Sequence, residues 1–577
     1  MYFFLFFIGA LTALAFERPQ YHVVPPLGHW MNDPNGPFYD EDTGIYHLFY
    51  QFNPYGFTWG NMSWAHVYSQ DLIHWTPLPV ALYPDEPYDD EGVFSGSIYR
   101  QRGKMPIIYY TCVDSEQRQR QCQAVPSLVE GRENLYESWR KSPDNPIVSR
   151  PPQNSPYYDQ FRDPALYVEV EDILQREKYE HGTSSEEGRE REIMIVAAQV
   201  DEYTGVVAKY QYGAEGKEGE DEVSHWAYIG DLWTTQHSSN PDAASESMVE
   251  CPDFFSVSTD GSSSGGGEQG ESPYILKYSL MNTRRDYYEV GAYVDGFFRP
   301  YAGKSYHKVD YGVPFAYYAS KTFWDNSLPN GRRLQWGWAS ETDGNSDERR
   351  HWAGVMSLPR VVTYDEEGGF LRYNVIPEVH SLHGAQLYSG EHIFKLGTIL
   401  PARNNTLRIL PLQTSSSQAY VRLQWDITTV MLGQRSGLCG PTVDVGVSIC
   451  GCGVNRTLVG FRLDPVGSVV STLIDTSYSG GTTPPTTEVN ALPFDRLSAS
   501  TREDAYKALV LEIYIDHSMI EAFSSGGMHA STLRVYSSHS DCDAIELFVR
   551  ESSKDAVAYK EANVPVAVDI HSISSLG

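Results

Sequence analysis

The feature that most constrains this fold is a long series of short apolar or alternating runs, separated by turn residues, between about Tyr21 and Arg360. Examples lie at residues 45–52, 106–111, 193–199 and 274–280. Several runs are apolar at both odd and even positions, which is typical of strands buried on both faces. Many short strands without intervening helices favour a barrel, a sandwich or a propeller, and a propeller best fits the length. We therefore predict an all-β fold.

A second strand-rich region runs from roughly Gly390 to Gly577, after a connector near Ile376, and it predicts a β-sandwich. A chain of 577 residues is too long for one ordinary core, so two domains are expected. The predicted boundaries are a signal peptide at 1–15, a propeller at 16–375, a linker at 376–390 and a sandwich at 391–577.

The N-terminus resembles a secretory signal peptide. Residues 1–16 form an apolar run that ends in the small-x-small pattern of Ala13 and Ala15, and polar sequence follows at once. No later segment looks transmembrane. Three N-glycosylation sequons, at Asn61, Asn404 and Asn455, agree with secretion. We expect an extracellular protein, with the vacuole or the cell wall as alternative destinations.

The cysteines suggest an oxidising compartment. Seven are present, an odd number, and we expect Cys251 to stay free while the other six could pair. Cys112 and Cys122 lie on two strand-like runs that flank a polar turn, where a cross-strand disulfide is possible. No metal site is expected.

The charge restricts the kind of ligand. The formal net charge is -31 and the sequence pI is about 4.9, so nucleic acid would be repelled. A neutral or cationic ligand fits better.

Two acidic residues stand out by their local sequence. Asp33, in WMNDPNG, precedes a proline and a glycine-containing turn, and Trp30 and Phe38 flank it. This context suits a rigidly held carboxylate, although an Asp in an ordinary solvated turn has the same pattern. Glu250, in SMVECPDFF, has apolar neighbours that could desolvate it and raise its pKa, as a general acid requires. The alternative is an ordinary glutamate at a strand end.

A third carboxylate, Asp163, follows Arg162 in the segment FRDP. Taken alone, this pair reads as a salt bridge in a loop, and the functional alternative is an acceptor for a sugar hydroxyl.

In this order, the three segments resemble the signature motifs of glycoside hydrolase family 32, the invertase family. The similarity extends through other segments of the chain: 51–54 (QFNP), 59–66 (WGNMSWAH), 94–97 (FSGS), 310–323, 337–360 and 516–523. The resemblance covers nearly the whole mature chain. It implies a five-bladed β-propeller followed by a C-terminal β-sandwich, with the catalytic carboxylates in the central funnel of the propeller.

The resemblance also implies residue roles. Asp33 would be the nucleophile, Glu250 the acid/base, and Asp163 a transition-state stabiliser that binds fructosyl hydroxyls. The residues implied to line the fructose pocket are Asn32, Gln51, Trp59, Phe94, Ser95 and Arg162. Two carboxylates, one that attacks and one that protonates the leaving oxygen, are what a retaining glycosidase needs, and they would lie about 5 to 5.5 Å apart.

The chain departs from plant-type invertases at positions that bear on the substrate. Val249 stands where these enzymes typically carry Trp, and Met281 and Arg284 stand where they tend to have an acidic and then a basic residue. A lost hydrogen-bond acceptor could shift preference towards fructans or towards transfer.

The expected activity is that of a retaining β-fructofuranosidase of invertase type, which acts on sucrose or fructans. The alternatives are a fructosyltransferase or fructan exohydrolase on the same scaffold and, less favoured, a non-catalytic sugar-binding protein. We expect no cofactor. The expected partner is a small carbohydrate such as sucrose or a fructo-oligosaccharide, with no nucleic acid and no membrane after signal removal, and the oligomeric state is open.

Overall fold

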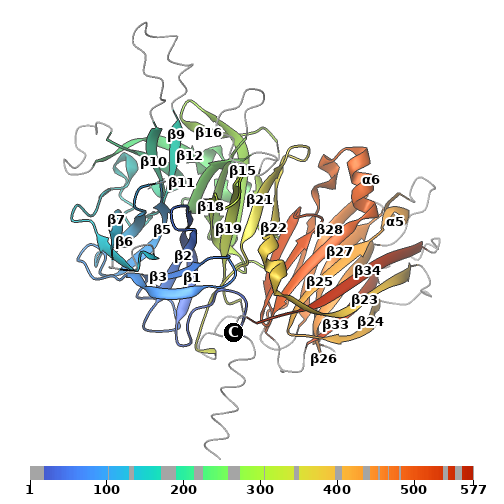
Figure 1. Ribbon diagram of the computed structural model, residues 1–577. Coiled ribbons are helices and arrows are strands. Elements are labelled where there is room, and N and C mark those ends of the chain that lie inside the picture. Colours follow the sequence, from blue (N-terminus) through green and yellow to red (C-terminus); the bar gives the residue numbers. More distant parts are fainter. Residues whose placement is uncertain are drawn as a thin grey trace, which may run out of the picture.

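The computed structural model describes residues 18–575 with internal gaps. The residues left out within this range are 102, 129–130, 132–134, 171–189, 214–224, 258–272, 304–305, 343–349, 397–405, 433–441, 453–454, 466, 480–482, 537–542 and 553–561. The expected signal peptide at 1–15 and the sequon at Asn404 therefore lie outside the described residues. The rest forms two all-β units that lie side by side (Figure 1).

Five antiparallel sheets make up the first unit. The first contains β1 (Trp30–Asp40), β2 (Ile45–Asn53), β3 (Ser63–Ser69) and β4 (Thr76–Leu82); the second contains β5 (Gly92–Tyr99), β6 (Ile107–Val113), β7 (Gln119–Ser127) and β8 (Ser138–Lys141). The third contains β9 (Phe161–Val170), β10 (Glu190–Asp201), β11 (Thr204–Tyr212) and β12 (Trp226–Thr234). The fourth contains β13 (Glu250–Ser256), β14 (Tyr274–Leu280), β15 (Arg285–Val294), β16 (Phe297–Pro300) and β17 (Tyr306–Lys308). The fifth contains β18 (Tyr318–Asp325), β19 (Arg332–Ala339), β20 (Val355–Met356), β21 (Arg360–Asp365) and β22 (Phe370–Val375).

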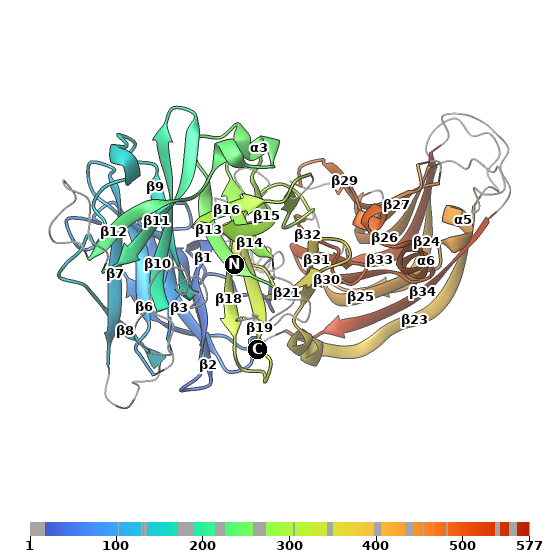
Figure 2. The ribbon, with the colours of Figure 1, turned by 90° about the horizontal axis from the view of Figure 1, so that it is seen from above.

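These sheets are the blades of a closed ring (Figure 2). The first strand of each blade contacts the first strand of the next, from β1 through β5, β9 and β13 to β18, and β18 contacts β1 again. A parallel bridge between Trp30 and Ala353 also links the last blade to the first. The predicted five-bladed propeller is therefore confirmed.

Packing between blades explains the sequence pattern. The run 45–52 in β2 is buried along its whole length, because each blade packs between two neighbours. Separate apolar clusters fill the spaces between successive blades: one joins β2 and β3 to β6 and β7, a second joins β6 to β9, β10 and β11, and a third joins β10 to β13, β14 and β15. Large aromatic side chains carry much of this packing, and Trp64, Trp233 and Trp336 are almost fully buried.

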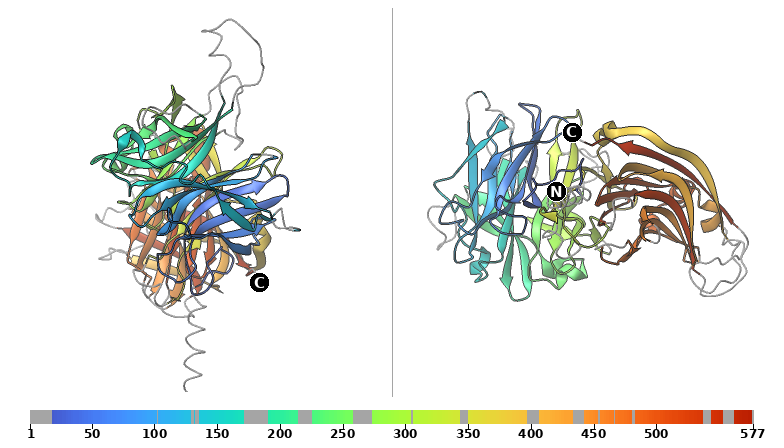
Figure 3. Two further views of the ribbon diagram at one scale, coloured as in Figure 1. Left: turned by 90° about the vertical axis from the view of Figure 1, so that its left-hand side faces the viewer. Right: turned by 90° about the horizontal axis from the view of Figure 1, so that it is seen from below.

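The second unit is a sandwich of two six-stranded sheets (Figures 1 and 3). One sheet has the order β23 (His383–Leu396), β34 (Ala562–Ile573), β25 (Gln418–Trp425), β30 (Leu509–Asp516), β31 (Met519–Ser524) and β32 (His529–Arg534). The other has the order β24 (Thr406–Ser415), β33 (Ala544–Ser552), β26 (Thr442–Cys452), β27 (Asn455–Asp464), β28 (Val469–Tyr478) and β29 (Thr487–Ala491). One apolar cluster lies between the two sheets. The predicted sandwich is confirmed.

Helices are short and peripheral in the described part of the chain. They are η2 (Pro152–Asn154), η3 (Thr235–His237), α3 (Pro241–Ala244), η4 (Pro377–Leu382), α5 (Thr428–Leu432), η6 (Pro493–Arg496) and α6 (Ala499–Lys507). We expected a linker over 376–390, whereas η4 occupies 377–382 and the first strand of the sandwich already begins at His383. None of the described helices is long and apolar enough to cross a membrane.

A buried polar interface joins the two units. The guanidinium of Arg360, in blade five, is fully buried and lies 3.0 Å from the carboxylate of Asp310. The same carboxylate accepts a hydrogen bond from the backbone N–H of Thr532, in the sandwich, at 2.9 Å. Asp516 of the sandwich also accepts backbone hydrogen bonds from residues 20–22. These contacts hold the sandwich against the propeller.

Candidate active site

The innermost strand of every blade is bulged, and the bulges contain or adjoin most of the predicted site residues. In all five blades, the pairing register between the first and second strands shifts. At each shift, the first strand contains one residue more than the second. The bulged residues are Asn32 and Asp33 in β1, Ser95 in β5, Asp163 and Pro164 in β9, Cys251 and Pro252 in β13, and Ala319 and Ser320 in β18. Bulges re-aim side chains and break the regular alternation of a strand.

The first bulge presents Asp33. The sequence suggested a turn at 33–36, but the structure places this segment inside β1. Gly36 has φ +45°, and a Cβ there would overlap Ile98 of the second blade, which explains the glycine. The Oδ2 atom of Asp33 accepts a hydrogen bond from the Ser95 hydroxyl at 2.6 Å, and Oδ1 accepts one from the Asn32 amide at 3.0 Å. Both donors are predicted pocket residues, and they fix the orientation of the carboxylate.

Electrostatics make Asp33 an unusual carboxylate. Burial raises its pKa to about 6, and repulsion from Asp163 and Glu250 acts in the same direction, while the hydrogen bonds from Ser95 and Asn32 oppose the rise. The three predicted acidic residues therefore interact electrostatically, although they are far apart in the sequence. A raised pKa of this kind is typical of functional carboxylates.

Glu250 is held by a cation on one side and by a phenol on the other. Its Oε1 accepts hydrogen bonds from Arg162, at 2.8 Å from Nη2 and 3.2 Å from Nε. The hydroxyl of Tyr318 donates to Oε2 at 2.7 Å. Burial opposes the charge on Arg162, but Glu250 and Asp163 outweigh this effect and raise the pKa of the guanidinium. The partners of Glu250 are thus polar, whereas the sequence drew attention to apolar neighbours.

Asp163 is the most deeply enclosed of the three carboxylates. It is 3% exposed, and its φ of +67° lies in the left-handed region, as a bulge allows. Its Oδ2 accepts the backbone N–H of Cys251, from the neighbouring blade, at 2.8 Å. Burial raises the pKa of Asp163 and Glu250 contributes to the rise, while Arg162 opposes it. The salt bridge that the sequence suggested between Arg162 and Asp163 is replaced by the pairing of Arg162 with Glu250.

The remaining predicted pocket residues lie in the first two blades. Gln51 is opposite the Asn32–Asp33 bulge and is almost fully buried, yet neither atom of its amide group has a hydrogen-bond partner among the described residues. Trp59 is 61% exposed, and its ring meets that of Phe94 edge-on at 5.9 Å. An unpaired buried amide and an exposed aromatic wall suit the binding of a polar, ring-shaped ligand.

Sequence reasoning assigned no role to Tyr318 or to the lysines behind the site. Lys277 is 1% exposed, and its ammonium group donates to the backbone carbonyl of Cys251 at 2.8 Å. Lys321 likewise donates to the carbonyl of Pro252 at 3.2 Å. The sequence did contain a signal for Lys277: it is a charged residue within the apolar run 274–280. Lysine is rarely buried without a partner, so this position indicates a buried polar contact.

Elsewhere in the part of the chain that the structure covers, two features bear on other kinds of site. No three or more His, Cys, Asp or Glu side chains there are arranged to hold a metal ion. A cavity of about 690 Å³ lies between β4 and β8, at the outer edges of the first two blades, and contains none of the residues discussed above. The reactive groups at the bulges are carboxylates held by hydrogen-bond donors.

Comparison with known proteins identifies the family. The sequence model of the glycosyl hydrolases family 32 N-terminal domain matches residues 22–176 and 183–374, and the model of the family's C-terminal region matches residues 395–564. The chain belongs to glycoside hydrolase family 32. This result confirms the resemblance in the sequence motifs, and it makes the chain a glycoside hydrolase.

Similar proteins in family 32 match along nearly the whole chain. A fructan 6-exohydrolase from Triticum aestivum is 30% identical over 563 residues, which cover 92% of this chain and 87% of the relative. The β-fructofuranosidase insoluble isoenzyme 7 from Oryza sativa subsp. indica is 31% identical over 584 residues, with 95% and 88% coverage. The crystal structure of fructan 1-exohydrolase IIa from Cichorium intybus has a TM-score of 0.72 at 25% identity, and covers 97% of this chain and 98% of that one.

Proposed function

We propose that this member of family 32 is a retaining β-fructofuranosidase, which hydrolyses terminal β-D-fructofuranosyl residues of sucrose or fructans through a fructosyl-enzyme intermediate. The observation that carries the proposal is the convergence of Asp33, Asp163 and Glu250. Each lies in or beside a bulge on the innermost strand of its own blade, and electrostatic repulsion couples all three.

In the first chemical step, the carboxylate of Asp33 attacks C2 of the fructosyl unit. A bond forms between the carboxylate oxygen and C2 as the bond from C2 to the glycosidic oxygen breaks, and that oxygen takes the proton of Glu250. The raised pKa of Asp33 makes it a stronger base than an exposed carboxylate, and Ser95 and Asn32 fix its direction of approach. Holding the nucleophile in one orientation reduces the entropic cost of reaction.

In the second step, water attacks C2 and the bond to Asp33 breaks. The ionised Glu250 takes the proton from this water and returns to its starting state. Arg162 and Tyr318 hold the two oxygens of Glu250 in place through both steps.

Asp163 acts on the transition state. Positive charge develops on the fructosyl ring as the bond to the leaving group breaks, and a nearby anion stabilises that charge. One oxygen of Asp163 is occupied by the backbone N–H of Cys251. We assign the other to fructosyl hydroxyls, together with the unpaired amide of Gln51. Trp59 and Phe94 form the aromatic wall beside the ring.

The test combines substrates, variants and stereochemistry. Purified protein should release fructose from sucrose, inulin or levan, and proton NMR at early times should show the β-anomer first, because two displacements retain configuration. Asp33→Asn and Glu250→Gln should each stay folded and lose at least about a thousandfold in kcat, since each removes a group that reacts directly. Turnover by Asp33→Asn at the wild-type rate, or inversion of configuration, would reject the mechanism. Binding of these sugars without turnover would support a sugar-binding protein.

A specific observation favours a fructan exohydrolase or fructosyltransferase as the second candidate. Val249 is a small aliphatic residue and is fully buried, so no aromatic ring stands at this position beside Glu250, and Met281 is 44% exposed. The guanidinium of Arg284 lies 4.9 Å from the ring of Phe315, which favours a fixed position. Thin-layer analysis of products at rising sucrose concentration separates the candidates: new oligofructans indicate transfer, and preferential loss of inulin or levan indicates exohydrolysis.

We further propose that the chain is secreted after removal of residues 1–15, with a propeller domain at 16–375 and a sandwich domain that begins at His383. The disulfide between Cys112 and Cys122 supports an oxidising compartment. Curated relatives include enzymes named as insoluble and as vacuolar isoforms. Expression in a secreting host, followed by N-terminal sequencing and deglycosylation, tests the cleavage site and the sequons.

A further inference from the structure

The innermost strand of the third blade, β9, is an edge strand of its sheet. Strand β10 pairs with β9 on one side only, so the backbone groups on the other side need partners from elsewhere. At Phe161 to Asp163, directly in the site, side chains of the second blade supply those partners.

Two glutamines hold Phe161 from both directions. The side chain of Gln119 accepts the backbone N–H of Phe161 at 3.0 Å, and the side chain of Gln121 donates to its carbonyl at 3.0 Å. Together they reproduce the pair of hydrogen bonds that a neighbouring strand would make. The Oε1 atom of Gln119 also accepts a hydrogen bond from Nη1 of Arg162 at 3.2 Å, so the same amide touches the cation that holds Glu250.

Thr111 completes the arrangement at the bulge. Its hydroxyl accepts the backbone N–H of Asp163 at 2.9 Å and donates to Oε1 of Gln121 at 3.1 Å. Gln121 in turn donates to Phe161, so these three hydrogen bonds and the backbone from Phe161 to Asp163 form a closed ring. Thr111 and Gln121 are both fully buried, and they are direct cross-strand neighbours on β6 and β7.

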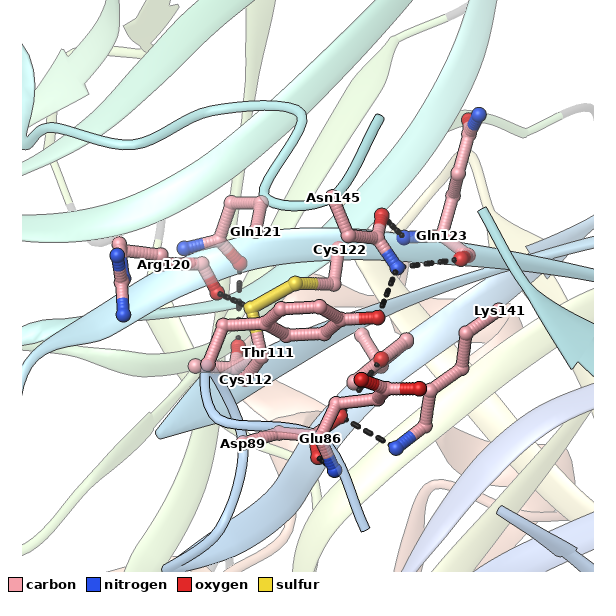
Figure 4. Close-up of a disulfide and its surroundings, with 12 residues drawn as sticks. Glu86, Asp89, Thr111, Cys112, Arg120, Gln121, Cys122, Gln123, Lys141 and Asn145 are labelled. Carbon is pink, nitrogen blue, oxygen red and sulfur yellow. Dashed lines mark hydrogen bonds and ion pairs between the residues drawn. A yellow bond between two sulfur atoms is a disulfide. The ribbon is translucent and has the colours of Figure 1, made fainter. Parts of the chain in front are cut away.

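The backbone of the second blade is itself fixed where it carries these side chains. The N–H and C=O of Gln121 both pair with Val148, and the N–H of Gln119 donates to Tyr158. The disulfide between Cys112 and Cys122 lies one position further along each strand (Figure 4). Since side chains alternate along a strand, it lies on the opposite face from Thr111 and Gln121.

We propose that Thr111, Gln119 and Gln121 are positioning residues of the hydrolase. They hold residues 161–163 in the bulged conformation that places Asp163 beneath the fructosyl ring and Arg162 against Glu250. The inference rests on the proposed function, because it assigns these residues a role in that reaction. None of the three touches a carboxylate of the site, so their effect passes through the backbone of β9 and through Arg162.

The test compares two replacements at one position. Thr111→Val keeps the shape of the side chain and removes the hydroxyl, whereas Thr111→Ser keeps the hydroxyl and removes the methyl group. We expect Thr111→Val to lower kcat about 10- to 100-fold with KM changed less than about threefold, since small misplacements of catalytic groups cost this much. The kcat of Thr111→Ser should stay within about threefold of wild type, because the hydroxyl is kept. Gln121→Met, which removes the donor to Phe161 at similar volume, should resemble Thr111→Val.

The double variant Cys112→Ser/Cys122→Ser is the matched control. It removes a covalent link from the same two strands and leaves the ring of hydrogen bonds in place. It should lower the unfolding temperature with kcat within about twofold of wild type when assayed well below that temperature, because the cost of losing a disulfide is one of stability.

The outcomes separate this inference from the proposed function. If wild type hydrolyses none of the fructosyl sugars, the proposed function fails. If wild type is active but Thr111→Val matches Thr111→Ser, the positioning role is wrong. It is also wrong if kcat follows the unfolding temperature across all variants, with the disulfide control included. Should Thr111→Val fail to fold, the comparison of Gln121→Met with the disulfide control decides between the same two results.

Discussion

Removing the Ser95 hydroxyl should move the acidic limb of the pH–rate profile upwards. This hydroxyl donates to Oδ2 of Asp33 at 2.6 Å, and the hydrogen bond favours the ionised carboxylate. Burial already raises the pKa of Asp33 to about 6. In Ser95→Ala, burial and the repulsion from Asp163 remain while one stabilising contact is lost, so the pKa should rise further. Attack on C2 requires the ionised form, so activity at low pH should fall.

The size of the shift follows from the strength of the contact. A hydrogen bond to a charged group contributes about 1.5–3 kcal/mol, and one pKa unit corresponds to about 1.4 kcal/mol. The pKa of Asp33 should therefore rise by about one to two units, to about 7 or 8. At pH 6, kcat/KM should fall about 5- to 50-fold relative to wild type, because about half of the wild-type carboxylate is ionised there. Above pH 8, the ratio should approach one.

The assay is kcat/KM for sucrose, or for the best fructan, between pH 4 and 9, because this parameter reports the free enzyme. Ser97→Ala is the control. It lies two residues along the same strand, and its hydroxyl has no hydrogen-bond partner among the described residues. A loss in Ser95→Ala that stays constant at every pH would refute the reasoning, since Ser95 would then act through substrate contact or through folding and not through the ionisation of Asp33.

Three further changes have defined outcomes. Asp33→Asn should raise the unfolding temperature at pH 7.5 and have little effect near pH 4. The folded pKa of about 6 lies above the usual 3.8, so the cost of the charge to stability builds up between about pH 3.8 and 6 and is complete above it. An equal gain at both pH values would contradict this. Arg360→Met should destabilise the protein by about 3–5 kcal/mol in urea unfolding, because it leaves the buried carboxylate of Asp310 without its cationic partner. Lys507→Ala, at an exposed ion pair, should destabilise the protein far less, and equal losses would refute the burial argument. Tyr318→Phe should lower kcat about 10- to 100-fold at an unchanged unfolding temperature, because it removes a hydrogen bond to Glu250. Wild-type kcat in this variant would contradict that role.

Local sequence predicted the strands well but not their assembly. The runs at 45–52 and 274–280 are β2 and β14, as expected, because continuous apolar sequence is what a strand between two layers requires. The number of blades came from resemblance to a family. No repeat period was visible, because insertions of different length separate β9 from β10 and β13 from β14. What closes the ring is contact between first strands of successive blades, and such contact leaves no fixed spacing in the sequence.

In the candidate site, too, local sequence predicted which residues matter but not which partners they contact. Arg162 and Asp163 are neighbours in sequence, which suggested a salt bridge, but Asp163 lies in a bulge and its carboxylate accepts the backbone N–H of Cys251. Arg162 instead pairs with Glu250, 88 residues away. Thr111 is a polar side chain in the largely apolar strand β6, whereas Gln121 is one of three glutamines in β7. That pattern indicates a buried polar contact without naming its partner, because the partner belongs to another blade.

The five bulges explain why the site needs a propeller and not only three motifs. A regular strand alternates its side chains between the two faces of a blade, and in a propeller both faces are packed against neighbours. A bulge in each of three innermost strands interrupts that alternation at Asp33, at Asp163 and beside Glu250. The cost is a set of backbone groups without ladder partners. Buried side chains satisfy several of them: Thr111 binds the N–H of Asp163, and Lys277 binds the carbonyl of Cys251. The catalytic carboxylates and the polar residues behind them are therefore one structural unit, in which each inner strand can leave its regular path only because a neighbouring strand or blade holds the exposed backbone.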